Sequence, residues 1–187
     1  MHNRFLLGLL ITTLIFASIA CNYPMRNRNT DAIPVTTDAA HSLEDNFNAA
    51  LEQLKTPGKV RLVIKEEELT SMLALELQHQ ENPVLANPQV FLRDGQMIVT
   101  GRVNQGGLSA DLEVVIEITV DTDGKPSYQV VTATVGSLPL PNSMMESLSD
   151  QIDIAFQNNI SPKVANVFIE SITIADGEMV IVGYSMM

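Results

Sequence analysis

The sequence predicts an α+β fold in which a curved antiparallel β-sheet packs on two to three amphipathic helices. Apolar residues recur at helical spacing in segments 41–55 and 66–80. Elsewhere apolar and polar residues alternate, as they do in strands with one covered face. Asp-Gly and Gly-Gly pairs separate these alternating segments, as in hairpin turns. We therefore expect a four-strand meander and a C-terminal hairpin, with a short strand at residues 60–64.

Each helix is predicted from an apolar stripe. In segment 41–55 the stripe consists of Leu43, Phe47, Leu51 and Leu54. In segment 66–80 it consists of Leu69, Met72, Leu73 and Leu77. A third helix is predicted to begin at Ser143, with Glu146 completing a capping box. Its stripe consists of Met145, Leu148, Ile152, Ala155 and Phe156.

Three turns set the expected register of the meander, at Asp94-Gly95, Gly106-Gly107 and Asp123-Gly124. A two-residue loop at each turn pairs apolar residues with apolar residues, and a slip of one residue would break every pair. The expected pairs are Leu92 with Met97, Val90 with Val99, Val103 with Ala110, Val99 with Val114, Ile116 with Val131, Val114 with Ala133 and Leu112 with Val135. One face of the meander is then covered and the other is solvated.

A second hairpin repeats the first. Segment 90–101 aligns without gaps on segment 172–183, which turns at Asp176-Gly177. Both hairpins follow a predicted helix, and both have Met after the turn and Gly at the end. The alternative is that any two Asp-Gly hairpins look alike, but the shared Met and Gly favour a pseudo-repeat of helix and hairpin.

Residues 1–20 show the pattern of a secretory signal peptide. Arg4 precedes an apolar run from Phe5 to Ile19, and Ala17, Ser18 and Ala20 supply small residues before Cys21. A permanent transmembrane anchor is the alternative, but a spanning helix needs about 20 apolar residues and this run is shorter.

Cys21 is the only cysteine of the chain and cannot form an internal disulfide. Its place after Ser18-Ile19-Ala20 resembles the lipobox of bacterial lipoproteins, although Ser18 stands where leucine is usual. The resemblance implies cleavage before Cys21, acylation of its thiol with palmitate-like chains, and a location on the extracytoplasmic face of the cell membrane. Two acyl chains give stable anchoring. The alternative is an ordinary cleaved signal followed by an incidental thiol.

The expected organisation is a signal peptide at 1–20, a flexible tether at 21–40 and one α+β domain at 41–187. The tether is rich in Asn, Thr, Asp and Pro and lacks an apolar period. Without Arg4 the chain carries 10 basic and 22 acidic residues, a net charge of −12. It has no Lys/Arg cluster to neutralise phosphates, which argues against nucleic-acid binding.

No recognisable catalytic or metal-binding motif occurs in the sequence. His41 and His79 lack Cys or acidic neighbours at metal-ligand spacing. No phosphate-binding glycine loop, G-x-S-x-G or H-E-x-x-H is found. Three consecutive acids at 66–68 are interpreted as a solvated helix start, and Asp121 and Asp123 as turn residues. We therefore predict no enzymatic activity, no cofactor and no metal; a hydrolase with unrecognised residues is the least favoured alternative.

The predicted binding site is an apolar groove between helices and sheet. Methionine adapts to flexible apolar ligands, although plain core packing also explains such residues. The candidate groove residues are Leu69, Met72, Leu73, Leu112, Val114, Met145, Ile152 and Phe156.

The order of motifs resembles bacterial envelope lipoproteins and, more remotely, the LmeA-like and YpmS-like relatives of tubular lipid-binding proteins. After the lipobox come Glu66-Glu67-Glu68-Leu69-Thr70, Asn87-Pro88-Gln89-Val90, Leu92-Arg93-Asp94-Gly95 with Gly101, and the closing segment 171–177 with Gly183. This resemblance implies a curved sheet around a long helix, with lipid bound between them, and no catalytic residues. The expected function is a membrane-tethered, non-enzymatic binder of a lipid or acyl chain. The alternative is a structural lipoprotein with a packed core that binds an envelope protein.

Overall fold

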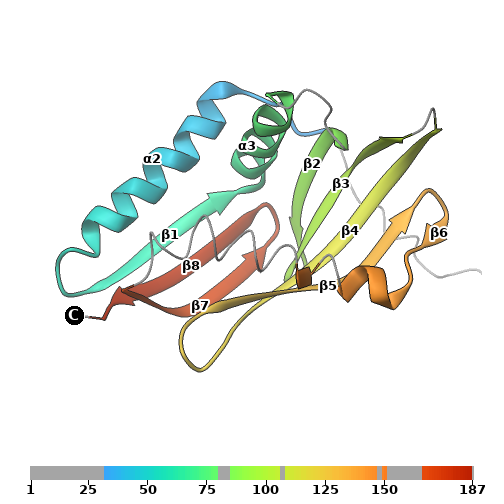
Figure 1. The fold of residues 1–187 in the computed structure, drawn as a ribbon. Coiled ribbons are helices and arrows are strands. Elements are labelled where there is room, and N and C mark those ends of the chain that lie inside the picture. The colour runs from blue at the N-terminus through green and yellow to red at the C-terminus, as the bar shows by residue number, and fades with distance from the viewer. Residues whose placement is uncertain (1–31, 80–84, 106–107, 147–148, 151–165, 187) are drawn as a thin grey trace, which may run out of the picture. The chain divides into compact units, whose positions relative to one another are not determined.

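The fold combines helices with two antiparallel sheets, which confirms the predicted α+β class (Figure 1). The computed structural model describes residues 32–79, 85–105, 108–146, 149–150 and 166–186. The helices are α2 (Thr37–Gln53) and α3 (Glu66–Gln78), and residues 142–146 and 149–150 are also helical. The strands are β1 (Lys59–Lys65), β2 (Leu85–Arg93), β3 (Gln96–Gln105), β4 (Leu108–Val120), β5 (Pro126–Val135), β6 (Leu138–Pro139), β7 (Val167–Ala175) and β8 (Glu178–Ser185).

The strands form a five-stranded meander, β2-β3-β4-β5-β6, and a three-stranded sheet, β1-β8-β7. Two details differ from the prediction. Segment 138–141 was expected to leave the sheet, but Gly136, at φ 61°, turns the chain back so that β6 pairs with the end of β5. The C-terminal hairpin also gains β1 as a third strand, which pairs with β8.

The predicted register of the meander is confirmed except at one point. Six of the seven expected pairs are present, but Ile116 faces Val130 instead of Val131. The cause is a bulge at Val115/Ile116 and a wider turn than two residues. The Asp121 carboxylate accepts hydrogen bonds from the backbone N–H groups of Asp123 (2.9 Å) and Lys125 (2.8 Å) and so supports the wider turn. The Gly106-Gly107 turn lies outside the described residues.

The two Asp-Gly hairpins share one strand register, although their turns differ: Asp94 has a positive φ of 51°, and Asp176 does not. Adding 82 to each residue number converts the seven β2–β3 pairs into seven of the eight β7–β8 pairs. The eighth pair, Ile169 with Gly183, has no counterpart, because the irregularity spans Ala86 to Gln89 in β2 but only Ile169 to Ser171 in β7. Gly101 and Gly183 occupy equivalent places in the two hairpins. An added Cβ would meet the Ala86 carbonyl at 3.1 Å in the first and the Phe168 carbonyl at 2.9 Å in the second. The pseudo-repeat is therefore present at the level of hairpin geometry.

Two of the predicted helices begin at residues other than those expected. The α2 helix begins at Thr37 instead of His41, because the Thr36 hydroxyl accepts a hydrogen bond from Ala39 N and caps the helix. Ile33 precedes the helix. Its backbone N–H donates to the Gln89 side-chain oxygen, and its carbonyl accepts from the Gln89 side-chain nitrogen. The folded unit, Ala32–Met187, thus includes residues expected in the tether. Ser143 lies within the first turn of its helix instead of capping it, because the Pro141 carbonyl accepts from Met144 and Met145 N–H.

Apolar residues gather in three clusters. The first joins α2, β1, β2 and the second hairpin around Leu92, which is fully buried. The second lies on the inner face of β4 and β5 around Ile116 and Ala133. The third lies on the opposite face of the meander, where Ile33 packs against Phe91, Ile98 and Val115. That face was expected to be solvated throughout, but the segment before α2 covers part of it.

Candidate functional site

The start of α3 differs from the solvated acidic turn that the sequence suggested. Glu68 is only 4% exposed, and its carboxylate accepts hydrogen bonds from Ser42 Oγ (2.8 Å), Asn46 Nδ2 (3.2 Å) and Lys65 N (2.9 Å). Glu66 pairs with Arg93. Among the three acids, Glu67 alone is exposed. Each acid therefore has its own environment, and two of them hold α3 to neighbouring elements.

Helix α3 also closes the free edge of β2. The Thr70 hydroxyl accepts from Val90 N at 2.9 Å, and Leu92 N donates to the Glu66 carboxylate at 3.2 Å. The four-residue step from Glu66 to Thr70 along the helix covers about 6 Å, and the two-residue step from Leu92 to Val90 along the strand covers about 6.6 Å. The two helix side chains therefore lie opposite the two strand N–H groups that they bind. A free strand edge is a liability that a covering helix removes. The polar side chains of α3 in this region are therefore engaged with neighbouring elements.

An apolar cavity of about 100 Å³ lies between the C-terminal half of α2 and the inner face of the β1-β8-β7 sheet. Almost every lining side chain is apolar, and its sides come from α2, β1, β5, β7 and β8. The lining residues are Phe47, Ala50, Leu51, Leu54, Val60, Leu62, Pro126, Tyr128, Val167, Ile169, Ile172, Ile181 and Gly183. Such a site excludes ions and polar ligands, because burying them here without partners costs several kcal/mol.

None of the predicted groove residues that the structure describes lines this cavity. Leu69 packs on the cluster around Leu92, whereas three others belong to the inner-face cluster of the meander: Leu112, Val114 and Met145. Met72 is 47% exposed, because α3 turns its polar residues inward, and Leu73 is half-buried. Ile152, Phe156 and Cys21 lie outside the described residues. The described residues of the predicted groove therefore lie in two apolar clusters and at the surface.

The cavity could have been found in part from the sequence. The stripe of α2 and the alternating residues of β1 were both predicted, and they supply one wall. The other wall requires the pairing of β1 with β8, which joins residues more than a hundred positions apart. No local pattern signals that pairing.

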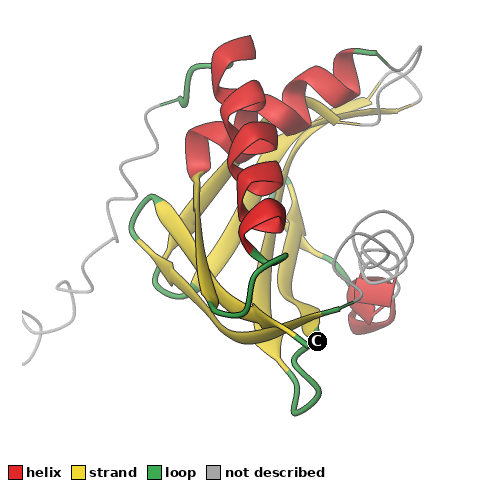
Figure 2. Cartoon of the chain, turned by 90° about the vertical axis from the view of Figure 1, so that its left-hand side faces the viewer, coloured by secondary structure: helices red, strands yellow, loops and turns green. Residues whose placement is uncertain are grey.

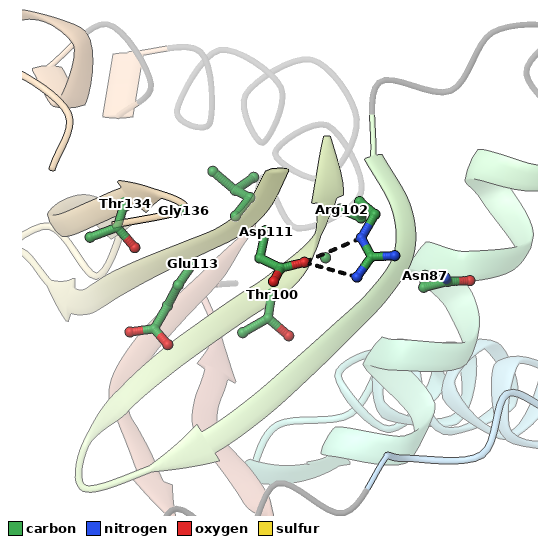
Figure 3. A pocket seen from close by; sticks show the side chains of 9 residues that line it. Asn87, Thr100, Arg102, Asp111, Glu113, Thr134 and Gly136 are labelled. Atoms are coloured by element: carbon green, nitrogen blue, oxygen red, sulfur yellow. Dashed lines mark hydrogen bonds and ion pairs between the residues drawn. The ribbon is translucent and has the colours of Figure 1, made fainter. Parts of the chain in front are cut away.

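A second, polar pocket of about 410 Å³ lies on the meander (Figure 3). Arg102 Nε and Nη2 each donate to Asp111 Oδ1 at 3.2 Å, and Figure 3 shows the two side chains directed at one another. Both are mostly exposed, so their ion pair contributes little to stability. The other lining residues are Asn87, Thr100, Gly101, Leu112, Glu113, Thr134 and Gly136. Without His or Cys in this set, the pocket offers neither a base near neutral pH nor a strong nucleophile.

The described part of the chain contains no group of three His, Cys, Asp or Glu residues able to hold a metal ion. None of its helices is both long and apolar enough to span a membrane. The fold and cavity thus define a class: an α+β protein with a small apolar site between a helix and an antiparallel sheet. The sequence matches no protein-family model, and comparison with curated proteins finds no significant relative.

Proposed function

We propose that this protein is a membrane-tethered extracytoplasmic lipoprotein that binds an acyl chain in the cavity beneath α2 and catalyses no reaction. The observation that supports the proposal is the apolar lining of that cavity. Cys21 would supply the anchor. A ligand without charge at its inserted end fits such a site, because it loses no hydrogen bonds on entry.

The size of the cavity limits what it holds. Sites for whole drug-sized ligands measure about 300–1,000 Å³, whereas this one measures about 100 Å³. It therefore accommodates the end of a chain, and deeper insertion requires α2 to move away from the sheet. The α2 helix is held at its N-terminal end by Leu43 and by the Ser42–Glu68 hydrogen bond. Its C-terminal half is the part that would move.

The test fills the cavity from α2. Ala50 is buried and lines the cavity, whereas Ala49, its neighbour on the same helix, is exposed. We expect Ala50→Phe to weaken binding of a fluorescent fatty acid to the full-length protein about tenfold, and Ala49→Phe to leave it unchanged. An added ring in a small cavity displaces the ligand or strains the core.

A second variant separates displacement from misfolding. Leu62→Ala enlarges the cavity from the sheet side and is expected to tighten fatty-acid binding, since the vacated volume is apolar. Equal affinities for all three variants, with urea midpoints showing each one folded, would rule out this cavity as the binding site.

A further inference from the structure

The outer edge of β1 presents unused backbone hydrogen-bonding groups. Ala175 and Glu178 flank a two-residue turn and therefore form a hydrogen-bonded pair. Partners alternate along a strand, so Glu178 and every second residue after it bond to β7, and the residues between them bond to β1. In β1, Arg61 and Val63 accordingly direct their N–H and C=O groups away from β8.

The same reasoning, applied to β2, places the outward groups at Val90 and Leu92. The structure agrees, because Thr70 and Glu66 bind those residues from outside the sheet. Other edges are closed in similar ways. Ser149 Oγ accepts from Val130 N of β5 at 2.9 Å, and Gly124 O accepts from Ile169 N of β7 at 3.1 Å.

The outer edge of β1, at Arg61 and Val63, differs from these closed edges. The backbone groups of these two residues make no hydrogen bond to any element across the outer edge within residues 32–79, 85–105, 108–146, 149–150 and 166–186. Helix α2 packs on the inner face of β1, where Val60 and Leu62 line the cavity together with side chains of α2. The Arg61 side chain is exposed on the opposite face.

The pseudo-repeat shows what fits at this edge. Ile64 of β1 faces Met179, and Ile116 of β4 faces Met97, while Met179 and Met97 are equivalent residues of the two hairpins. Strand β1 therefore holds the place beside β8 that β4 holds beside β3. The outer edge of β4 is paired with β5. The corresponding edge of β1 carries no strand in the described part of the chain.

We propose that the outer edge of β1 binds an extended segment of a partner protein as an added strand, with acidic residues at alternate positions of that segment. Lys59, Arg61 and Lys65 lie on one face of β1 in an otherwise acidic chain. Lys59 contacts Glu170 and Lys65 contacts Glu67, but both pairs are exposed and weak. Strand addition takes affinity from the backbone and specificity from alternate side chains.

The charges also exclude a second copy of β1 as the partner. Antiparallel pairing of β1 with itself would place basic side chains opposite basic side chains, which destabilises a sheet. An alternating acidic and apolar strand instead matches Arg61 on one face and the Val60–Leu62 side on the other. This proposal does not depend on the cavity or on its ligand.

The test uses a synthetic peptide that alternates glutamate and valine, added to the full-length protein. We expect it to slow hydrogen exchange at the Arg61 and Val63 amides. Arg61→Glu is expected to weaken binding about tenfold and to create affinity for the corresponding lysine–valine peptide. The matched control is Lys125→Glu, in the β4–β5 turn, which should change neither.

Val63→Pro tests the backbone. Proline is tolerated on an edge strand where its missing N–H points outward, so the protein should fold and lose peptide binding. The proposal would be overturned if the glutamate–valine peptide bound without slowing exchange at the Arg61 and Val63 amides. It would also be overturned if the folded Val63→Pro variant bound the peptide as well as the unchanged protein. So would an Arg61-dependent affinity for anionic phospholipid vesicles with none for the peptide.

Discussion

Thr70 and Ser71 of α3 are fully buried although both are polar. Each hydroxyl replaces a backbone partner that a neighbouring element lacks. Thr70 serves Val90 on the free edge of β2, and Ser71 accepts from Thr36 N at the start of α2, at 3.1 Å. A buried backbone N–H without a partner costs about 1–3 kcal/mol. Helix α3 is thus held to its neighbours by buried polar contacts as well as by its apolar residues.

Thr70→Val should therefore destabilise the fold by about 1–3 kcal/mol, because valine keeps the shape of threonine but leaves Val90 N–H buried without an acceptor. Urea unfolding followed by circular dichroism measures the change. Thr119→Val is the control, since Thr119 is exposed on β4 and its change should stay within about 0.5 kcal/mol. Similar losses in the two variants would contradict this role of the hydroxyl.

At the scale of elements, the two equivalent hairpins predict different responses to the same substitution. In Gly183→Ala the new Cβ meets a backbone atom, Phe168 O, at 2.9 Å, which cannot move without shifting the strand. In Gly101→Ala the closest contacts are Leu85 Cδ1 (2.6 Å) and Cγ (2.8 Å), on a side chain that can rotate, and the backbone contact, Ala86 O, is further away at 3.1 Å. We expect a loss of about 1–3 kcal/mol for Gly183→Ala and a smaller one for Gly101→Ala. Thermal unfolding of both variants checks the order, and the reverse order would contradict it.

Strand pairing was the most predictable feature because the alternation of side chains and the turn residues act locally and agree. The one wrong pair among those predicted for the meander, Val131 in place of Val130, arose from a bulge that alternation does not reveal. The apolar stripe of α3 did not predict which residues of the helix are buried, because Glu68 and Thr70 are buried by partners distant in sequence. The cavity beneath α2 was not predicted for the same reason, since pairing of β1 with β8 decides where it lies.

At the scale of the whole folded unit, α3 and the tip of the second hairpin connect the two sheets. Gly177 N donates to Leu92 O at 2.9 Å, and Glu66 N donates to Gly177 O at 3.0 Å. Arg93 completes the junction by binding the Glu66 carboxylate, and that hydrogen bond raises the pKa of Arg93 above its ordinary value. Helices α2 and α3 pack on one another beside this junction (Figure 2). The two sheets should therefore unfold together.

Glu66→Gln tests that coupling. The variant keeps the shape of the side chain but removes the charge that pairs with Arg93 and that accepts from Leu92 N. Both side chains are less than a third exposed, so we expect a loss of about 1.5–3 kcal/mol. We also expect faster hydrogen exchange at Gly177, because its N–H donates to Leu92 O and the Leu92 N–H is held by the Glu66 carboxylate. The control is Glu52→Gln, which removes an exposed pair with Lys55 and should cost no more than about 0.5 kcal/mol. Faster exchange confined to α3, with Gly177 unchanged, would show that the hairpin tip is held independently of Glu66.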